Sequence, residues 1–262
     1  MTRSLRSGWG VAPAAVMTAI GVYVPLLLLF RLSLCAPARG RGFYEPGSWT
    51  LQNYARLADP LVARTAAFTI VFGLTVAAVS VALGYASALF LYRLTERGQR
   101  IGLALLLLPK TAGLLATLFG IQYWLDRGLF AALIGEVYFV FPYSVLVLFA
   151  ALRRIDPDWL GAARGLGASR WQIFRRIVLP LSRPALLVAF QLSALWGLGS
   201  FLGPLFLGEP RHSTLSVEFH RRAFEYGEWP LAAAEATLLL GLLLLAVVGL
   251  PSIARQPPRR TP

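Results

Sequence analysis

The sequence predicts an all-α polytopic membrane protein with six transmembrane helices, and three observations carry this prediction. Hydrophobic residues make up 57 % of the 262-residue chain, charged residues make up only 14 %, and the mean hydropathy is +0.64. Soluble domains average about 45–50 % apolar and about 25 % charged residues. A water-facing shell cannot cover such an apolar excess, because surface area grows too quickly relative to volume. Six apolar stretches each approach the roughly 20 residues with which a helix crosses a bilayer.

The same composition excludes several other classes of protein. An ordinary soluble enzyme and a disordered chain are both far more polar. The single cysteine, Cys35, excludes an intrachain disulfide framework and a cysteine-based metal cluster. A net charge of +13 would suggest nucleic-acid binding in a soluble chain. Here the positions of the basic residues follow a membrane topology instead.

The expected spans follow one another along the whole chain, so we expect a single transmembrane domain over residues 1–262. The first span follows Arg3 and Arg6, and its apolar run is longer than the roughly 7–15 residues of a secretory signal. Prolines and glycines interrupt several spans, which bundled membrane helices tolerate. The spans are expected at residues 11–32, 65–92, 101–123, 129–152, 184–207 and 231–250.

The distribution of arginine predicts the orientation of these spans. Connections on one side carry 15 arginines and three acidic residues, whereas those on the other side carry nine arginines and seven acidic residues. Cytoplasmic connections of membrane proteins are enriched in lysine and arginine. We therefore expect the arginine-rich side, which includes both termini, to be cytoplasmic.

One connection on the arginine-rich side is long, and its residues 153–183 predict a helix–turn–helix between the fourth and fifth spans. Asp156 is a candidate N-cap, and Pro157 falls at the first helical position, where its missing N–H costs nothing. Gly165 and Gly167 can adopt positive φ angles and turn the chain.

A second helix is expected directly after this turn. Ser169 and Gln172 have the spacing of a capping box. Trp171 and Phe174 fall on one face and most of the arginines elsewhere, so we expect this helix to lie at the membrane surface and to end at Leu179-Pro180. A basic amphipathic helix bound to anionic lipid is the alternative interpretation, although it does not account for the glycine turn.

Short residue groups in this loop occur at a specific spacing: Ala162-Ala163, then Gly167-Ala168-Ser169, Phe174, Ile177-Val178 and Leu179-Pro180. Their pattern resembles the E-A-A…G loop of ABC-importer permease subunits. The end of the fifth expected span, residues 199–208, and the later segment 226–234 resemble the spermidine/putrescine-type branch of that family. The resemblance extends over almost the whole chain.

The resemblance implies a type I ABC import permease in a bacterial cytoplasmic (inner) membrane. In that family the loop docks in a groove of a cytoplasmic ATPase, which binds ATP and Mg²⁺ and rocks the permease from inward- to outward-facing. The implied partners are two ATPase subunits, a second permease subunit (homologue or copy) and an external solute-binding protein. The residues that the resemblance places in the ATPase-coupling loop are Gly161, Ala162, Ala163, Leu166, Gly167, Ala168, Ser169, Phe174, Leu179 and Pro180.

The chain departs from the family pattern in two places. Gly161 stands where the family has the leading acid of the loop, and Asp158 lies three residues too early to replace it. The outer connection between Tyr123 and Leu129 is also shorter than relatives usually have. The first departure concerns the strength of ATPase coupling, and the second concerns the external gate.

The sequence lacks the parts of a motor or a hydrolase. Its only lysine, Lys110, follows Pro109, so the G-x-x-x-x-G-K-[ST] loop that cradles phosphates is absent. Both histidines, His212 and His220, lie in one outer connection without a good third ligand for a metal. We therefore expect no catalytic residue, no metal site and no cofactor bound by this chain itself.

Five side chains within the expected spans are candidates for the substrate path. Ionisable groups inside a membrane are costly and by default suggest a pathway, and those found here are Glu136, Glu235 and Lys110. Trp196 and Tyr143 would add cation–π contacts to a polyamine cation. Structural alternatives stay open: Glu235 at the membrane interface, Glu136 paired with Lys110, and both aromatic rings in ordinary packing.

A polyamine such as spermidine or putrescine is the best guess for the substrate, although ferric iron, thiamine and phosphonates enter through similar permeases. A structural or assembly membrane protein with a partner-docking loop is the alternative from another class. An ion-driven secondary transporter would show inverted repeats with charges at matched positions, which the sequence lacks.

Overall fold

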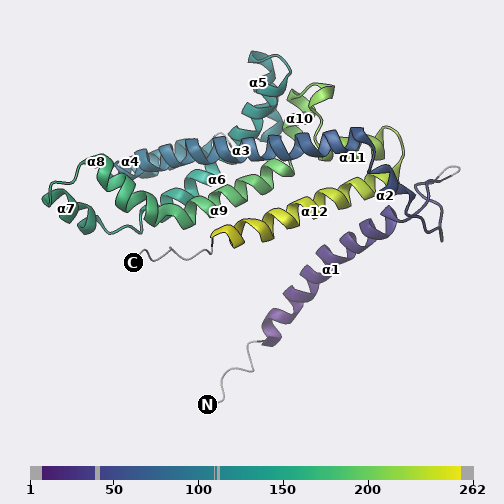
Figure 1. Cartoon of the computed structure of the whole chain (residues 1–262), viewed down its shortest axis with the longest axis horizontal. Helices are drawn as coiled ribbons and strands as arrows, with labels where there is room; N and C mark the ends of the chain where they lie inside the picture. The colour runs from purple at the N-terminus through teal and green to yellow at the C-terminus, as the bar shows by residue number, and fades with distance from the viewer. Residues whose placement is uncertain (1–7, 39–41, 109, 111–112, 255–262) are drawn as a thin grey trace, which may run out of the picture. The chain divides into compact units, whose positions relative to one another are not determined.

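In the computed structural model of the chain, residues 8–38, 42–108, 110 and 113–254 are described. Every regular element within these ranges is helical, which confirms the all-α prediction (Figure 1). Pro109 and the basic residues of the two termini lie outside the described ranges. In chain order the elements are α1 (Gly8–Ser33), α2 (Gln52–Arg56), α3 (Pro60–Tyr92), α4 (Glu96–Leu107), α5 (Leu114–Trp124), α6 (Leu129–Leu152), α7 (Pro157–Gly165), α8 (Arg170–Ile173), the π-helical turn η2 (Phe174–Val178), α9 (Leu179–Leu198), α10 (Leu202–Leu207), the 3₁₀ turn η3 (Pro210–His212), α11 (Leu215–Phe224) and α12 (Trp229–Ala254).

Five helices of the described chain are long and apolar enough to cross a membrane. They are α1, α3, α6, α12 and the helix that runs without interruption from Arg170 to Leu198. The expected fourth span, residues 129–152, matches α6 at both ends. A chain that crosses the membrane several times is thereby confirmed, whereas the count of six spans stays a prediction.

The expected third span, residues 101–123, is wrong as a single helix. Its residues are divided between α4, which ends at Leu107, and α5, which begins at Leu114. Directly before α5, Gly113 has a φ of +81°, in the left-handed region that a right-handed helix cannot include. Each piece is therefore shorter than the roughly 20 residues that cross a bilayer.

The fifth span begins and ends earlier than expected. Leu179-Pro180 does not end the loop helix, because η2 leads directly into α9 with the proline in its first turn. Because Pro180 lies inside this continuous helix and has no N–H, it leaves out one backbone hydrogen bond, and the π-helical turn η2 lies directly before it. At the other end the helix stops at Leu198, residues 199–201 are not helical, and α10 forms separately.

The described chain divides into two compact units. The first contains the described parts of residues 1–64 and 218–240. In this unit the buried Asn53 ties α2 to the end of α1, because its side-chain amide donates hydrogen bonds of 2.8 Å to the carbonyls of Ser33 and Cys35.

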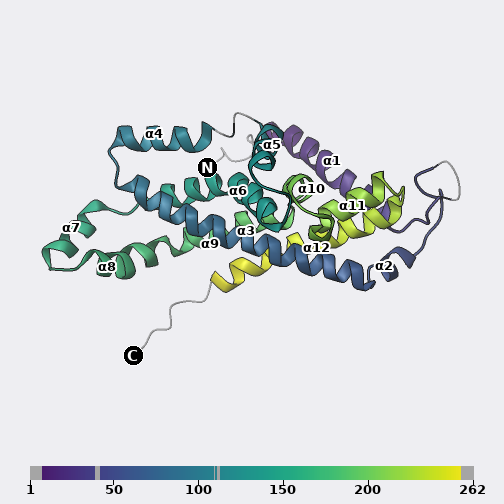
Figure 2. The same cartoon turned by 90° about the horizontal axis from the view of Figure 1, so that it is seen from above.

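The second unit contains the described parts of residues 65–217 and 241–262, and α6 lies at its centre along α9 (Figure 1 and Figure 2). A hydrogen bond of 2.8 Å joins the hydroxyls of Ser144 and Ser193 across these two helices. One apolar cluster packs α6 against α3, α7, α8 and α9, and a second packs it against α3, α5 and α10. The hairpin of α7 and α8 lies at one end of this unit in both views.

Candidate functional site

The connection between α6 and α9 forms a helical hairpin, which we call the loop hairpin (residues 156–173). As predicted, Asp156 caps α7: its carboxylate accepts a hydrogen bond of 2.9 Å from the N–H of Asp158. Pro157 occupies the first turn of the helix. An N-cap of this type contributes about 1 kcal/mol to helix stability, so local residues fix the start of α7.

The turn of the loop hairpin is a Schellman motif. Gly167 has a φ of +82°, and its N–H donates to the carbonyl of Arg164 at 2.9 Å. The N–H of Ala168 donates to the carbonyl of Ala163 at 3.0 Å. Gly165, in contrast, does not take a positive φ, because it is still the last residue of α7. The spacing between Ala162-Ala163 and Gly167-Ala168 therefore brings together the backbone groups whose hydrogen bonds close this turn.

The predicted capping box begins α8. The hydroxyl of Ser169 accepts from the N–H of Gln172 at 3.3 Å, and the Gln172 side-chain oxygen accepts from the N–H of Ser169 at 2.7 Å. Outside these caps the hairpin exposes three large apolar side chains: Leu166 is 89 % exposed, Trp171 65 % and Trp159 57 %. Large apolar side chains exposed together are typical of a surface that a partner covers.

The inner face of the loop hairpin is anchored in the second unit. Leu160 of α7 and Ile173 of α8 are buried in one apolar cluster with Leu152 of α6 and Ala189 of α9. Burying an aliphatic side chain of this size contributes roughly 1.5–3 kcal/mol. Because closely packed side chains transmit strain, a force on the hairpin reaches α6 and α9.

The remaining residues of the expected coupling loop occupy two different environments. Gly161 and Ala162 lie on the exposed face of α7, and a Cβ atom at Gly161 would meet no atom within 4 Å. Phe174 and Leu179 are half-buried, whereas Pro180 is exposed at the start of α9. The expected coupling motif thus has one part on the exposed face of α7 and another part that leads into α9, the fifth expected span.

A second candidate site surrounds Glu136 of α6. Its carboxylate is buried and accepts a hydrogen bond of 2.8 Å from the hydroxyl of Ser200, which lies between α9 and α10. Gly203 approaches so closely that a Cβ atom there would lie 2.8 Å from this carboxylate. Together with Phe139 and Trp196, these residues line a cavity of about 200 Å³. The carboxylate therefore has a neutral donor and faces a cavity.

The ammonium group of Lys110 lies against a cluster of three aromatic rings. It donates to the carbonyl of Phe139 and lies 3.8 Å from the centroid of that ring and 4.4 Å from the centroid of Tyr143. Trp196 stacks on Tyr143, with centroids 5.9 Å apart, and its centroid lies 5.2 Å from that of Phe139. Both cation distances are in the range of cation–π interactions. In the described part of the chain, Lys110 and Glu136 form no ion pair.

Glu235 of α12 lies in an ion-pair network of the first unit. Its Oε1 lies 2.6 Å from Nε of Arg222, as an ion pair without the alignment of a hydrogen bond. Arg222 of α11 also pairs with Glu218 and with Glu228, each at 3.2 Å. Burial lowers the pKa of Arg222, but the three carboxylates, Glu235 foremost, raise that pKa above its usual value on balance. The guanidinium therefore stays charged and joins α11 to the start of α12.

The structure brings four of the five path candidates together in the second unit: Glu136, Lys110, Tyr143 and Trp196. Sequence reasoning missed Phe139 and Ser200. Phe139 lies three residues after Glu136 and four before Tyr143, a spacing that places all three on one helix face and could have identified it. Ser200 follows the end of α9, where no periodic pattern indicates a partner. Among the described residues, no group of three or more His, Cys, Asp or Glu side chains is placed to hold a metal ion.

The family described as "Binding-protein-dependent transport system inner membrane component" matches residues 70–254, which include both candidate sites. The chain is 28 % identical over 260 residues to the spermidine/putrescine transport system permease protein PotB of Salmonella typhimurium, over 88 % of this chain and 90 % of that protein. It is also 28 % identical over 266 residues to the permease protein PotC of Escherichia coli, over 97 % and 95 % of the two chains.

Solved structures show a similar fold. A bacterial ABC transporter involved in the import of the acidic polysaccharide alginate matches with a TM-score of 0.72 at 18 % identity, over 93 % of this chain and 92 % of that chain. The MetNI methionine ABC transporter, in an inward facing conformation, matches with a TM-score of 0.61 at 19 % identity, over 76 % and 98 % of the two chains. At these identities the likeness concerns the fold alone.

Proposed function

The chain belongs to the family of binding-protein-dependent transport system inner membrane components and is a multi-pass permease subunit of an ABC importer, and we propose that its substrate is a polyamine such as spermidine or putrescine. In this proposal an external binding protein delivers the substrate, and a second permease subunit completes the path. The loop hairpin docks on a cytoplasmic ATPase, which binds ATP and Mg²⁺ and hydrolyses ATP. Both termini lie in the cytoplasm.

One observation carries the choice of substrate: the aromatic cluster beside Glu136 accommodates a primary alkylammonium group, that of Lys110. A polyamine is an alkyl chain with several such groups, so one substrate nitrogen suits the rings of Phe139 and Tyr143. A second nitrogen suits the carboxylate of Glu136, which among the described residues accepts a side-chain hydrogen bond from the neutral Ser200. A phosphonate anion, in contrast, would meet a buried carboxylate in this cavity. The names of the two relatives support the same substrate.

In this proposal Lys110 competes with the substrate for the rings of Phe139 and Tyr143. Its ammonium lies about as close to the rings of Phe139 and Tyr143 as a bound cation can, so substrate nitrogen and Lys110 exclude each other there. When a polyamine enters, Lys110 leaves the rings; when the site empties, Lys110 returns. The lysine thereby keeps other cations out of an empty path.

Support for ATPase docking comes from the loop hairpin. Its exposed surface carries Leu166, Trp159 and Trp171, which an apolar groove of a partner would bury. Its inner face is packed into the cluster that contains α6 and α9, the helices that supply Glu136 and Trp196. Movement of a docked ATPase would therefore reach the substrate site through packed side chains.

The substrate is tested with the permease reconstituted in proteoliposomes together with an ATPase, a second permease subunit and a binding protein from the same organism. We expect ATP-driven uptake of radiolabelled spermidine, with competition by putrescine and none by thiamine, ferric citrate or a phosphonate. ATP-driven uptake of one of those competitors instead would replace the substrate assignment but keep the importer. If no solute stimulates ATP hydrolysis, the structural or assembly alternative gains support.

The docking role is tested separately at the glycine turn. Gly167→Trp forces a side chain into a left-handed backbone position, where non-glycine residues cost roughly 1–2 kcal/mol. We expect unchanged membrane insertion but no co-purification with the ATPase. Gly165→Ala is the matched control, because Gly165 is still helical and has open space around its Cβ position. Unchanged co-purification and transport in Gly167→Trp would contradict docking through this loop.

A further inference from the structure

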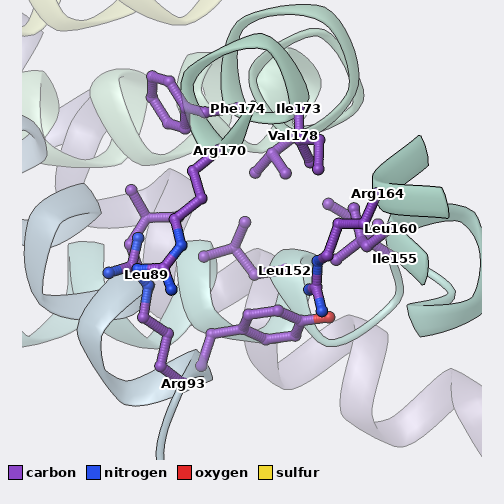
Figure 3. A pocket seen from close by; sticks show the side chains of 11 residues that line it. Leu89, Arg93, Leu152, Ile155, Leu160, Arg164, Arg170, Ile173, Phe174 and Val178 are labelled. Carbon is purple, nitrogen blue, oxygen red and sulfur yellow. The ribbon is translucent and has the colours of Figure 1, made fainter. Parts of the chain in front are cut away.

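A second cavity lies behind the loop hairpin (Figure 3). It measures about 370 Å³ and is formed by the end of α3, the end of α6, both helices of the hairpin and η2. Its apolar part consists of the buried side chains Leu152, Ile155, Leu160 and Ile173. Small-molecule sites have volumes of roughly 300–1,000 Å³, so the cavity is large enough for part of a small amphiphile.

Three arginines line this cavity from three different segments. Arg93 directly follows α3, Arg164 belongs to α7, and Arg170 begins α8. In Figure 3, Arg93 and Arg170 extend from opposite walls toward the same end of the cavity, and Arg164 reaches in from the other end. No residue of the lining is acidic, and within the described part of the chain none of the three arginines is paired with a carboxylate. The like charges of Arg93 and Arg170 repel each other where the side chains converge, and a bound anion would offset this repulsion by attracting both.

The position of the cavity along the membrane helices indicates the kind of anion. Two helices that can cross a membrane end at it: α3 at Tyr92 and α6 at Leu152. The 24 residues of α6 suit a single membrane crossing, so the residues just beyond Leu152 lie at the level of the lipid headgroups. A ligand with a phosphate beside an apolar chain would satisfy the arginines and the buried aliphatic side chains together.

We propose that this cavity binds an anionic phospholipid of the phosphatidylglycerol type, with its phosphate against Arg93 and Arg170 and with Arg164 at the other end of the cavity. Arginine and phosphate form strong, often bidentate, charge-assisted hydrogen bonds. Basic pockets between membrane helices on the cytoplasmic side are suited to anionic headgroups. The bound lipid links the end of α3 to both helices of the loop hairpin. This site goes beyond the transport function, because it needs neither substrate nor ATPase.

A carboxylate from a docked protein would present the same charge to these arginines. It would leave the apolar part of the cavity unfilled, however, since a short acidic side chain carries little apolar surface. The four buried aliphatic side chains therefore favour the phospholipid.

The test measures lipid binding to the full chain, purified in a neutral detergent. Native mass spectrometry counts bound dioleoyl-phosphatidylglycerol, with dioleoyl-phosphatidylcholine and inorganic phosphate as comparison ligands. We expect one phosphatidylglycerol to bind at least tenfold more tightly than phosphatidylcholine and to raise the melting temperature. Equal affinity for the two lipids overturns the proposal. Inorganic phosphate that stabilises the chain as much as the lipid overturns the assignment to a lipid.

Matched variants separate the cavity from general surface charge. The first triple variant, Arg93→Gln/Arg164→Gln/Arg170→Gln, removes the three arginines that line the cavity. The second, Arg97→Gln/Arg175→Gln/Arg176→Gln, removes three arginines that are expected on the same side of the membrane but do not line the cavity. We expect the tight phosphatidylglycerol to be lost in the first triple variant and kept in the second. Equal loss in both, or retention in both, overturns the site.

Two further arms keep the result interpretable. If the cavity triple variant does not fold, Arg170→Gln alone replaces it, with an expected loss of at least threefold in lipid affinity; an unchanged affinity overturns the site. The second arm adds the ATPase in phosphatidylcholine nanodiscs, without anionic lipid. If the cavity variant weakens ATPase binding there as much as it weakens lipid binding, the arginines serve a protein carboxylate and the proposal fails.

Discussion

The two carboxylates buried in membrane-spanning helices, Glu136 and Glu235, have opposite surroundings. Glu235 is fully buried, and the guanidinium of Arg222 lies 2.6 Å from it. Glu136 is also buried, but it accepts a hydrogen bond from the neutral hydroxyl of Ser200 and faces a cavity. One carboxylate is held by a fixed cation within the first unit. The other, in the second unit, has no such ion pair among the described residues.

This difference teaches that burial of an acid does not by itself identify a transport residue. Separating a buried ion pair leaves an uncompensated charge and is strongly unfavourable, so Glu235 cannot readily exchange Arg222 for a passing cation. A carboxylate that holds only a hydroxyl loses no ion pair when a cation arrives. We infer that Glu136 belongs to the substrate path and that Glu235 holds α11 and α12 together.

The largest expected effect tests whether the ion pair of Glu235 with Arg222 stabilises the fold. Arg222→Gln removes the cation that Glu235, Glu218 and Glu228 share. Because a buried carboxylate is left without a partner, we expect a loss of about 3–5 kcal/mol in the free energy of unfolding. The change is measured as the melting temperature of the purified chain in detergent, followed by tryptophan fluorescence. At roughly 2–4 °C per kcal/mol for a chain of this size, the expected decrease is on the order of 10 °C.

The control for Arg222→Gln is Arg56→Gln. Arg56 pairs with the same Glu228 at 2.9 Å, but both side chains of that pair are substantially exposed. Exposed pairs contribute about 0–1 kcal/mol, so Arg56→Gln is expected to lower the melting temperature only slightly. Equal destabilisation by the two variants would contradict the special role of the buried pair. The double variant Arg222→Gln/Glu235→Gln is expected to recover part of the stability lost in Arg222→Gln.

The second prediction tests whether the negative charge of Glu136 serves substrate uptake. Glu136→Gln keeps an acceptor for the Ser200 hydroxyl but removes the negative charge. We expect the melting temperature to stay close to that of the unaltered chain and spermidine uptake to fall at least tenfold, equivalent to about 1.4 kcal/mol. Uptake is compared at matched expression with Glu235→Gln. That variant is expected to lower the melting temperature while uptake per folded molecule stays unchanged.

Two results would break this assignment. Unaltered uptake kinetics in Glu136→Gln would remove the carboxylate from the path. A loss of uptake in folded Glu235→Gln equal to that in Glu136→Gln would show that the ion-pair network also serves transport. Ser200→Ala sharpens the comparison, because it removes the hydroxyl and leaves the charge, and we expect it to reduce uptake less than Glu136→Gln does.

Local chemistry explains which parts of the fold the sequence predicted. The caps at Asp156 and Ser169 and the turn at Gly167 depend on residues within a few positions of one another, and each was predicted correctly. Hydropathy averaged over a window located α6 but missed the interruptions at Gly113 and after Leu198. A single glycine with a positive φ hardly changes the average hydropathy of a window, yet a continuous right-handed helix cannot include it.

The residues of the candidate sites could be predicted where they are conspicuous in the sequence, but not where they depend on contacts between distant segments. Glu136 and Tyr143 were found because charged and aromatic residues inside an apolar stretch are conspicuous. The contact between Glu235 and Arg222 joins two helices with no periodic relation between the residues, so the sequence suggested a path residue or an interfacial carboxylate and not this ion pair. Convergence of Arg93 with Arg170 depends on the packing of α3 against the loop hairpin, which no local pattern encodes.

The smallest expected effect concerns Lys110, whose ammonium lies where the proposed substrate nitrogen would bind. Lys110→Met removes the internal competitor while keeping an unbranched apolar side chain. We expect spermidine to bind the purified permease about threefold more tightly, since cation–π contacts contribute about 0.5–1 kcal/mol at accessible sites. Lys110→Arg is the control, because it keeps a cation for the rings and is expected to leave the affinity within twofold. Isothermal titration calorimetry measures both. Weaker binding in Lys110→Met would contradict this competition and would make Lys110 a residue that supports substrate binding.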